Sequence, residues 1–436
     1  MALPSNVTAV QSAAGSPGKK GNFLFPFIMV TSLFFFWGFI HNVDGVLIAH
    51  LRRGFSLNTV KASLVDSAVY LGYFIMAIPA GIIMKKYGYK TGILIGLALF
   101  AGGCFLFIPA ANTMQYALFL GALFILACGL AILETAANPY ATILGKPETA
   151  TQRLNFAQSF NGLAAFLAPL IGAKLILSSK PVDDATLAAM TDQVRTAYLH
   201  QETSTVKLPY LILGIALVLV FLVFLFTKLP DIKDTEQKEK KGIFHAFRHR
   251  HLTMSVIAEF CYVGAQVCIF NFIILFASNV VHITDQQAAI YAMLTGLAFM
   301  IGRFAGTFFM RYIQPSKLLS LYAVASILLC LVIMWGSGII TLYATIAVAF
   351  FMSIMFPTIF ALGIHDIGDD TKSGSTLLIM SIVGGAILPR ILALISGSEA
   401  RNFQRGYIIP LLCFAVILYF GLKGYKHTER AVEELH

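Results

Sequence analysis

The chain contains the stretch LETAANPY, Leu133–Tyr140, inside a long apolar run that extends from Tyr116 to Leu144. An apolar run of this length predicts a membrane-spanning helix. Glu134 is the only charged residue in the run. A carboxylate near mid-membrane costs about 2.5–3.5 kcal/mol on insertion scales, so it usually faces a cavity or a partner rather than lipid. We therefore expect Glu134 to carry a proton or to contact a polar solute; the alternative is a structural carboxylate tied to a neighbouring helix.

Two residues beside Glu134 bear on the same site. Asn138 adds an amide, which both donates and accepts hydrogen bonds and is a candidate ligand for a polar substrate. Pro139 removes a backbone donor and predicts a kink in the helix.

The composition of the whole chain indicates a multi-spanning membrane protein. Of its 436 residues, 58% are hydrophobic and 12% are charged, whereas soluble proteins contain about 25% charged residues. The net charge of +10 comes mostly from lysines and arginines in short loops, which is the pattern of membrane proteins. We therefore expect the lipid bilayer, and no nucleic acid, as a partner.

Several functional classes lack their motifs in this sequence. We find no phosphate-binding P-loop, no His-Glu-x-x-His and no Gly-x-Ser-x-Gly, so we expect neither an ATP-driven engine nor an enzyme. The six cysteines all fall inside apolar runs, and we expect free thiols rather than disulfides or a metal site. No cofactor is expected.

About twelve apolar segments are each near the 20 residues needed to cross the hydrocarbon core. The expected fold is an all-α membrane protein of about twelve transmembrane helices in two pseudo-repeated six-helix halves. The expected domains are a cytoplasmic tail at 1–21, a first half at 22–229, a cytoplasmic linker at 230–251, a second half at 252–425 and a cytoplasmic tail at 426–436. A polar loop is expected at 178–207.

The basic loops predict the orientation in the membrane, because lysine and arginine gather on the cytoplasmic side. The loops around Lys85–Lys90, Lys146–Arg153 and 230–251 are basic, so we expect both termini in the cytoplasm. No cleavable signal peptide is expected, and the first helix would be the targeting signal. We expect a monomer in a cell inner membrane.

The two halves repeat weakly in sequence. Ala80–Tyr87 (AGIIMKKY) resembles Ala305–Tyr312 (AGTFFMRY), and Pro139 corresponds to Pro357. These matches occur in order and at a nearly constant spacing. They indicate two parallel halves, which is the layout of major facilitator transporters, with a binding site between the halves near the bilayer midplane.

The first span contains a polar patch after an aromatic run. His41 and Asp44 are three residues apart and share a helix face, which suits a proton relay or a contact with a solute hydroxyl. The alternative is a local pair near the outer water interface. Asn42, in the same patch, is a candidate substrate ligand.

Two other spans carry candidate sugar ligands. Span five has Asn155, Gln158 and Asn161 in one stripe, and amides suit the hydroxyls of a neutral sugar. The alternative for this stripe is hydrogen bonding between helices. The candidate ligands in span seven are Tyr262, Gln266 and Asn271, of which the first two share a helix face.

Three further charged residues lie in apolar spans. Glu259 is expected nearer the cytoplasmic end of span seven. Arg303 is expected near the cytoplasmic end of span eight, where it would reach lipid headgroups or a loop carboxylate. Arg390 in span eleven is expected to extend to the interface or to find a carboxylate.

Four stretches resemble the L-fucose–proton symporter family, which also includes bacterial glucose/galactose and N-acetylglucosamine transporters. They are LETAANP at 133–139, RLNFAQSFN at 153–161, FCYVGAQ at 260–266 and FPTIF at 356–360. The first is the most specific, and the resemblance covers nearly the whole chain.

The resemblance implies a twelve-helix major facilitator fold and proton-coupled uptake of a monosaccharide by alternating access. Members of the family use a carboxylate in span one and a glutamate in span four, and the glutamate matches Glu134. The polar span-five residues of the family match Gln158 and Asn161. Its span-seven glutamine matches Gln266.

The first span departs from the family pattern. Relatives commonly read Asn-Asp before Ile-Leu, whereas Asp44-Gly45 stands before Val46-Leu47 here. A displacement by one residue rotates a side chain by about 100° on a helix. Either Asp44 serves with an altered geometry, helped by His41, or the role of the span-one carboxylate is lost.

The predicted function is proton-coupled symport of a neutral monosaccharide, of the fucose, glucose/galactose or N-acetylglucosamine type. Its proton-coupling residues would be Glu134, Asp44 and His41. A sodium-coupled or uncoupled sugar carrier on the same fold is the alternative. A receptor or sensor that does not transport is a third hypothesis, against which the repeated halves and the buried polar stripes argue.

Overall fold

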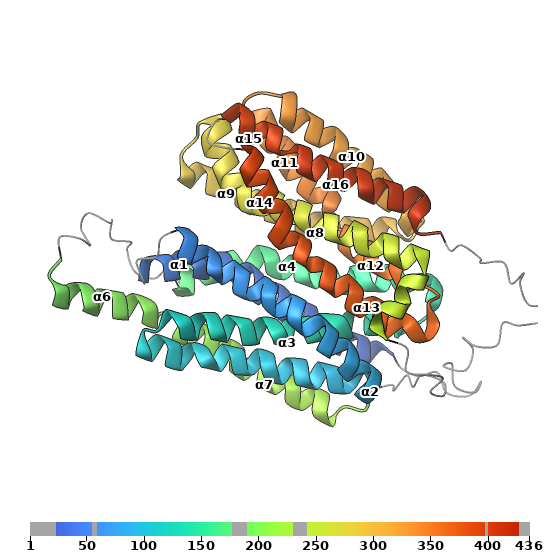
Figure 1. Ribbon diagram of the computed structural model, residues 1–436, viewed down its shortest axis with the longest axis horizontal. Helices are drawn as coiled ribbons and strands as arrows, with labels where there is room; N and C mark the ends of the chain where they lie inside the picture. Colours follow the sequence, from blue (N-terminus) through green and yellow to red (C-terminus); the bar gives the residue numbers. More distant parts are fainter. Residues whose placement is uncertain (1–22, 55–58, 177–189, 230–241, 397–399, 427–436) are drawn as a thin grey trace, which may run out of the picture.

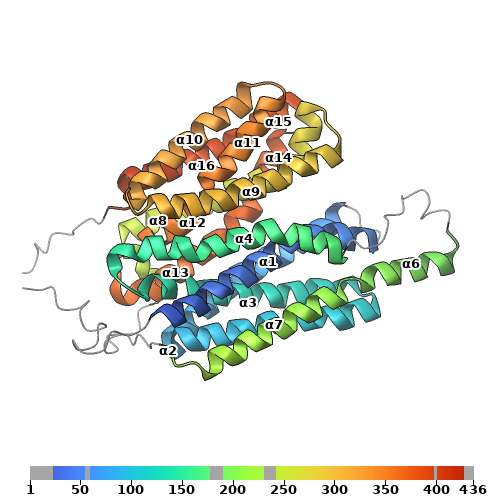
Figure 2. The ribbon, with the colours of Figure 1, turned by 180° about the vertical axis from the view of Figure 1, so that it is seen from behind.

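The computed structural model describes residues 23–54, 59–176, 190–229, 242–396 and 400–426, and these residues form helices joined by turns, without a β-strand. The helices form two bodies that lie side by side, one from the first half of the chain and one from the second (Figures 1 and 2). This arrangement confirms the predicted all-α class and its two halves.

The first half begins with a long helix and contains one bent helix, α2, that is long enough to cross a membrane twice. Its elements are α1 (Leu24–Gly54), α2 (Thr59–Thr113), α3 (Tyr116–Ile143), η1 (Pro147–Thr149), α4 (Ala150–Ile176), α6 (Asp192–Ser204) and α7 (Lys207–Phe226). Gly88 divides α2 into two spans, because its φ of 81° lies in the left-handed region that favours glycine.

The expectation of a loop over the whole of 178–207 is wrong for the part that the structure describes as α6. This segment, Asp192–Ser204, has no apolar face long enough to enter the membrane, but its residues suit a helix and pack on α1 and α2. Contact with the ends of two spans therefore orders a segment whose polarity alone indicated a loop.

In the second half, several of the described spans are made of more than one helical element. Its elements are η2 (Ile243–Arg248), α8 (Arg250–Phe276), η3 (Ala277–Val281), α9 (Asp285–Phe309), α10 (Pro315–Trp335), α11 (Ile339–Met352), α12 (Met355–Gly363), η4 (Gly368–Asp370), α13 (Thr371–Met380), η5 (Ser381–Val383), α14 (Gly384–Ser396), α15 (Ala400–Gly406), α16 (Ile408–Tyr419) and η6 (Phe420–Gly424). One span is α11 with α12, one is α13, η5 and α14, and one is α16 with η6.

The number of spans agrees with the sequence. Within the described ranges, nine helical segments are long and apolar enough to cross a membrane, and one of them is the bent α2. The two spans of α2, together with α1 and α4, bring the total to twelve. The six cysteines are free and lie in these helices, as expected.

The kink predicted at Pro139 has a packing consequence. Proline has no N–H, so the carbonyl four residues earlier, that of Thr135, loses its helical donor. The Ser375 hydroxyl of α13 donates to this Thr135 oxygen at 2.7 Å. The hydrogen bond that α3 lacks at Thr135 is thus replaced by a hydrogen bond between the two halves.

Most contacts between the halves gather at one end of the molecule, where α13 packs on α2 and α3 and α4 packs on α9 (Figure 1). Gly81 is required there, because a Cβ at this position would fall 2.1 Å from the Thr376 Oγ1 of α13. The same end carries basic loops: Lys90 Nζ donates to the Thr227 carbonyl at 2.8 Å, and Arg248 pairs with Asp370 at 3.0 Å. We refer to it as the basic end.

Candidate functional site

Two hydrogen-bonded groups of buried or half-buried polar side chains lie close together where the halves meet, because Glu134 of one group and Asn138 of the other are four residues apart on α3. We define the interface cluster as Tyr73 of α2, Glu134 and Asn138 of α3, Gln158 and Asn161 of α4, and Arg303 of α9. Four of its six members are residues that the sequence predicts for the site. The other two, Tyr73 and Arg303, enter the site through the fold.

Glu134 is the acidic member of the interface cluster. Its side chain is 5% exposed, and Tyr73 Oη donates a hydrogen bond of 2.5 Å to Glu134 Oε1. A hydrogen bond to a charged acceptor stabilises the charged form of that group. The tyrosine therefore gives Glu134 a means to hold a negative charge inside the membrane, which a carboxylate facing lipid would lack.

The predicted amide stripe on α4 connects three other helices. Gln158 Nε2 donates to Asn138 Oδ1 of α3 at 3.1 Å, and Asn155 Nδ2 donates to Thr358 Oγ1 of α12 at 3.2 Å. Hydrogen bonding between helices, the alternative given for the stripe, is therefore present. Asn138 Nδ2 and Asn155 Oδ1 have no hydrogen-bond partner among the described residues, so both retain capacity for a ligand.

Arg303 is the cationic member of the interface cluster and bridges the halves. Its Nη1 donates to the Gln158 carbonyl at 2.5 Å, to Gln158 Oε1 at 3.1 Å and to Asn161 Oδ1 at 3.2 Å. Its guanidinium also lies 4.6 Å from the ring centre of Phe299. Among the described residues no carboxylate pairs with it, so neutral oxygens and a ring face solvate the charge.

The expectation that Arg303 reaches lipid headgroups or a loop carboxylate is wrong. Its side chain is 3% exposed, and it lies two turns from the end of α9. Pro357 explains part of this position, because it frees the carbonyl of Ser353, to which Arg303 Nε donates at 2.9 Å. Pro139 and Pro357, the repeat pair, thus each free a carbonyl that accepts a hydrogen bond from another helix.

The span-seven candidates, all on α8, divide into a buried residue and two more accessible ones. Tyr262 is fully buried and its ring centre lies 6.1 Å from that of Phe356. Its hydroxyl interacts electrostatically with Arg303 but has no hydrogen-bond partner among the described residues. Gln266 is half-buried and Asn271 is exposed, and neither belongs to the interface cluster. The structure thus brings Tyr262, but not these two amides, to Arg303.

For the candidates in span one, the structure describes the backbone alone. His41, Asn42 and Asp44 lie on α1, but their side chains are outside the part of the chain that the structure describes. Three residues before His41, Gly38 packs against Asn161, where a Cβ would fall 2.8 Å from the Asn161 backbone. This close approach brings α1 alongside the amide stripe.

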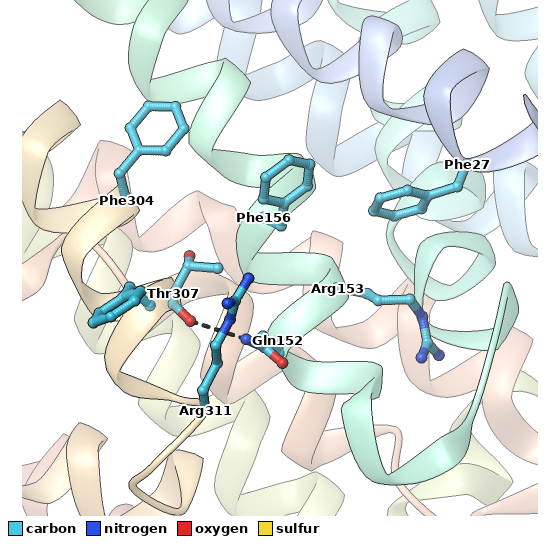
Figure 3. A pocket seen from close by; sticks show the side chains of 8 residues that line it. Phe27, Gln152, Arg153, Phe156, Phe304, Thr307 and Arg311 are labelled. Carbon is cyan, nitrogen blue, oxygen red and sulfur yellow. Dashed lines mark hydrogen bonds between the residues drawn. The ribbon is translucent and has the colours of Figure 1, made fainter. Parts of the chain in front are cut away.

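A cavity of about 320 Å³ lies between α1, α4 and α9, toward the basic end (Figure 3). It is lined by Phe27, Gln152, Arg153, Phe156, Phe304, Thr307, Phe308 and Arg311. Gln152 Nε2 donates across it to the Thr307 carbonyl at 3.2 Å. None of the predicted sugar ligands whose side chains the structure describes lines this cavity, and no member of the interface cluster does either, so the two are distinct.

The arrangement as a whole suits a solute carrier rather than a catalyst. In the part of the chain that the structure describes, amides and the Arg303 cation lie between two helical bodies, near a carboxylate that accepts a hydrogen bond from a tyrosine hydroxyl. Sequence reasoning missed Tyr73 because a tyrosine in an apolar span is not distinguished from a packing residue. Arg303 did carry a signal, since a charge in an apolar span is rare, but its depth was misjudged.

Comparisons with known proteins agree with the helical fold in two halves. Residues 26–389 match the model of the Major Facilitator Superfamily. The chain is 41% identical to the L-fucose-proton symporter of Escherichia coli strain K12, over 93% of this chain and 94% of that protein. It is also 41% identical to a glucose/galactose transporter of Brucella abortus, over 94% of this chain and 96% of that protein.

A solved structure gives the same result in three dimensions. The chain superimposes with a TM-score of 0.86 on the crystal structure of a Major Facilitator Superfamily transporter, FucP, in the outward conformation. The two are 40% identical in sequence, and the match covers 93% of this chain and all of the other. The likeness therefore extends through both halves.

Proposed function

Because the chain belongs to the Major Facilitator Superfamily, we propose that it is a proton-coupled symporter of a neutral monosaccharide that works by alternating access. Its relatives are transporters rather than enzymes, and the protein is accordingly a membrane transporter. The names of the relatives favour a sugar of the fucose or glucose/galactose type, and the sequence resemblance adds the N-acetylglucosamine type.

The proposal of proton coupling rests on Glu134. It is a buried carboxylate at the junction of the halves, with a hydroxyl donor that stabilises its charged form. Such a group is stable either neutral or charged, which a proton carrier requires. A proton taken from the outer side would neutralise Glu134, favour sugar binding between the halves and allow them to rock.

The amides beside Glu134 are the proposed sugar ligands. Asn138, Gln158 and Asn161 form hydrogen bonds that link α3, α4 and α9, and sugar hydroxyls can replace such bonds one for one. Tyr262 would offer its ring to the apolar face of the sugar. Gln266, Asn271 and Asn42 remain proposed ligands that the sugar would reach when the halves move.

Asp44 and His41 are proposed as further proton-coupling residues of the first span. The displacement of Asp44 favours a second candidate function, a sodium-coupled or uncoupled sugar carrier. In that case Glu134 would be a sugar ligand or a structural residue. The two functions differ in whether a proton gradient drives accumulation.

The proposed setting is the inner membrane of a cell, with the basic end in the cytoplasm and a monomer as the working unit. Lys90, Arg248 and the linker at 230–251 support this orientation, because basic loops favour the cytoplasmic side. The proposed domains are two six-helix halves, 22–229 and 252–425, with tails at 1–21 and 426–436.

Uptake of radiolabelled fucose, glucose, galactose, mannose and N-acetylglucosamine into proteoliposomes tests the proposal. An inward proton gradient should drive accumulation of at least one of these sugars, and Glu134→Gln should abolish accumulation while sugar exchange survives. Glu148→Gln is the matched control, because Glu148 is exposed in the short helix η1. Accumulation driven only by sodium, or equilibration under both gradients, would overturn proton coupling.

A further inference from the structure

Glu259 is a second buried carboxylate, and the interface cluster does not include it. It lies in the first half of α8, and its side chain is fully buried. Neither Glu259 Oε1 nor Oε2 has a hydrogen-bond partner among the described residues. Buried polar groups in folded proteins are nearly always satisfied, so a carboxylate with two unpartnered oxygens requires an explanation.

The position of Glu259 relates it to Glu134. Glu134 lies nine residues from the end of α3 at Ile143, and Glu259 lies nine residues from the start of α8 at Arg250. At 1.5 Å per residue, both carboxylates lie about 14 Å along the helix from the basic end. Helices α12 and α13 pack on both α3 and α8, so the two helices that carry the carboxylates share neighbours (Figure 1).

Two titratable side chains interact electrostatically with Glu259. One is Glu134 of α3, whose charge acts on it, and the other is Tyr262, which is three residues further along α8. The charged residues on the other elements packed against α8 form no ion pair with Glu259 in the part of the chain that the structure describes. They are Arg248, Arg303, Lys372, Arg390, Arg405 and Lys423.

These surroundings decide which carboxylate holds a proton. Two like charges that interact in a dry interior cannot both form without a large penalty. Glu134 has the Tyr73 hydroxyl to stabilise its charge, whereas Glu259 has no hydrogen-bond donor among the residues that the structure describes. In this arrangement Glu259 is therefore the neutral acid of the pair, and it carries a proton that the function proposed for Glu134 does not use.

We propose that Glu259 is the inner station of a two-carboxylate proton relay, which receives its proton from Glu134 and releases it at the basic end. When that end opens, the O–H bond of Glu259 breaks and the proton passes to water. The O–H bond of Glu134 then breaks as a new one forms on Glu259, so one proton crosses in each cycle. The pair returns to the state seen here, with Glu259 neutral and Glu134 free to bind the next proton. This inference rests on the proposed proton symport.

Glu259→Gln tests the relay, because glutamine keeps the shape and the neutral state but cannot release a proton. In proteoliposomes we expect proton-driven sugar accumulation to slow at least about tenfold, since a proton-transfer group is removed. Sugar exchange, which needs no net proton release, should stay close to the wild-type rate. Glu259→Asp should restore part of the accumulation, and Glu148→Gln should leave both rates unchanged.

Infrared difference spectra between acid and alkaline pH give a readout that does not depend on transport. The wild type should show the carbonyl stretch of a buried neutral carboxylic acid, and Glu259→Gln should lose part of that band. Glu148→Gln should retain it. Thermal unfolding in detergent checks that Glu259→Gln is folded, and its midpoint should match the wild type because a neutral group replaces a neutral group.

The outcomes separate this inference from the proposed function. A wild-type protein that shows no proton-driven accumulation overturns the symport itself. A wild type that couples to protons, with Glu259→Gln unchanged in accumulation and in the infrared band, overturns the relay and makes Glu259 a structural residue. Equal loss of accumulation and exchange in a folded Glu259→Gln would also overturn it, because sugar binding would then be the affected step.

Discussion

Glu134 and Glu259 have the same side chain and the same depth but opposite surroundings. Glu134 is 5% exposed and accepts a hydrogen bond from Tyr73, whereas Glu259 is fully buried and has no partner for either oxygen among the described residues. One site therefore stabilises a charge and the other excludes it. The comparison teaches that the role of a membrane carboxylate depends on a single nearby donor rather than on its depth.

The double variant Glu134→Gln with Glu259→Gln should have the largest effect on proton-driven accumulation, because it removes both carboxylates. With both carboxylates replaced, proton-driven accumulation should be lost completely, and the remaining sugar exchange should be independent of pH. If the two groups act in series, the double variant should be no worse than Glu134→Gln alone. Sugar exchange, which survives in Glu134→Gln, measures this: the double variant should exchange sugar as fast as Glu134→Gln does, and a further loss of exchange would mean that Glu259 acts independently of Glu134.

Arg303→Ala should have the next largest effect, because the cation lies between the two halves and beside Tyr262. Its loss leaves the oxygens of Gln158 and Asn161 without a donor, which costs about 1–3 kcal/mol, or about 5- to 150-fold in an equilibrium. We expect uptake to fall by a factor in that range.

The control for Arg303→Ala is Arg311→Ala, which removes an exposed arginine just beyond α9. It should change uptake far less. Initial rates at several sugar concentrations, together with the unfolding midpoint of each variant, distinguish weaker sugar binding from weaker folding. Equal effects of the two variants would contradict a specific role for Arg303.

Tyr73→Phe should have the smallest effect on uptake. It removes the hydroxyl that donates to Glu134 and so leaves Glu134, like Glu259, without that donor. Without the hydroxyl, the ionised carboxylate is less stable, so Glu134 keeps its proton up to a higher pH. Loss of a hydrogen bond to a charged group is worth about 1.5–3 kcal/mol, so the pH profile of uptake should move upward by about one unit or more.

Uptake rates measured over a range of pH in matched proteoliposomes check the effect of Tyr73→Phe. Tyr87→Phe is its control, because Tyr87 is an exposed tyrosine on the same helix. A profile that coincides with that of the wild type would mean that the Tyr73 hydrogen bond does not govern the proton on Glu134.

The two prolines of the repeat show which features of the helices the sequence predicted and which it did not. The sequence predicted a kink at Pro139 and placed Pro357 at the corresponding position of the second half, and each proline leaves a carbonyl without its helical donor. The sequence did not indicate what the freed carbonyls accept. The Ser375 hydroxyl and the Arg303 guanidinium take those positions, and both come from helices distant in sequence.

Hydropathy along the chain was sufficient to predict twelve spans, two halves and the buried carboxylate of α3, because a membrane helix must bury every backbone polar group and cannot tolerate unpaired charge. Those constraints act locally and leave a pattern in the order of residues. The partner of each polar side chain leaves no such pattern, since it depends on how helices rotate and pack against each other. Tyr73 beside Glu134, Arg303 on the amide stripe and the unpartnered oxygens of Glu259 all arise from that packing.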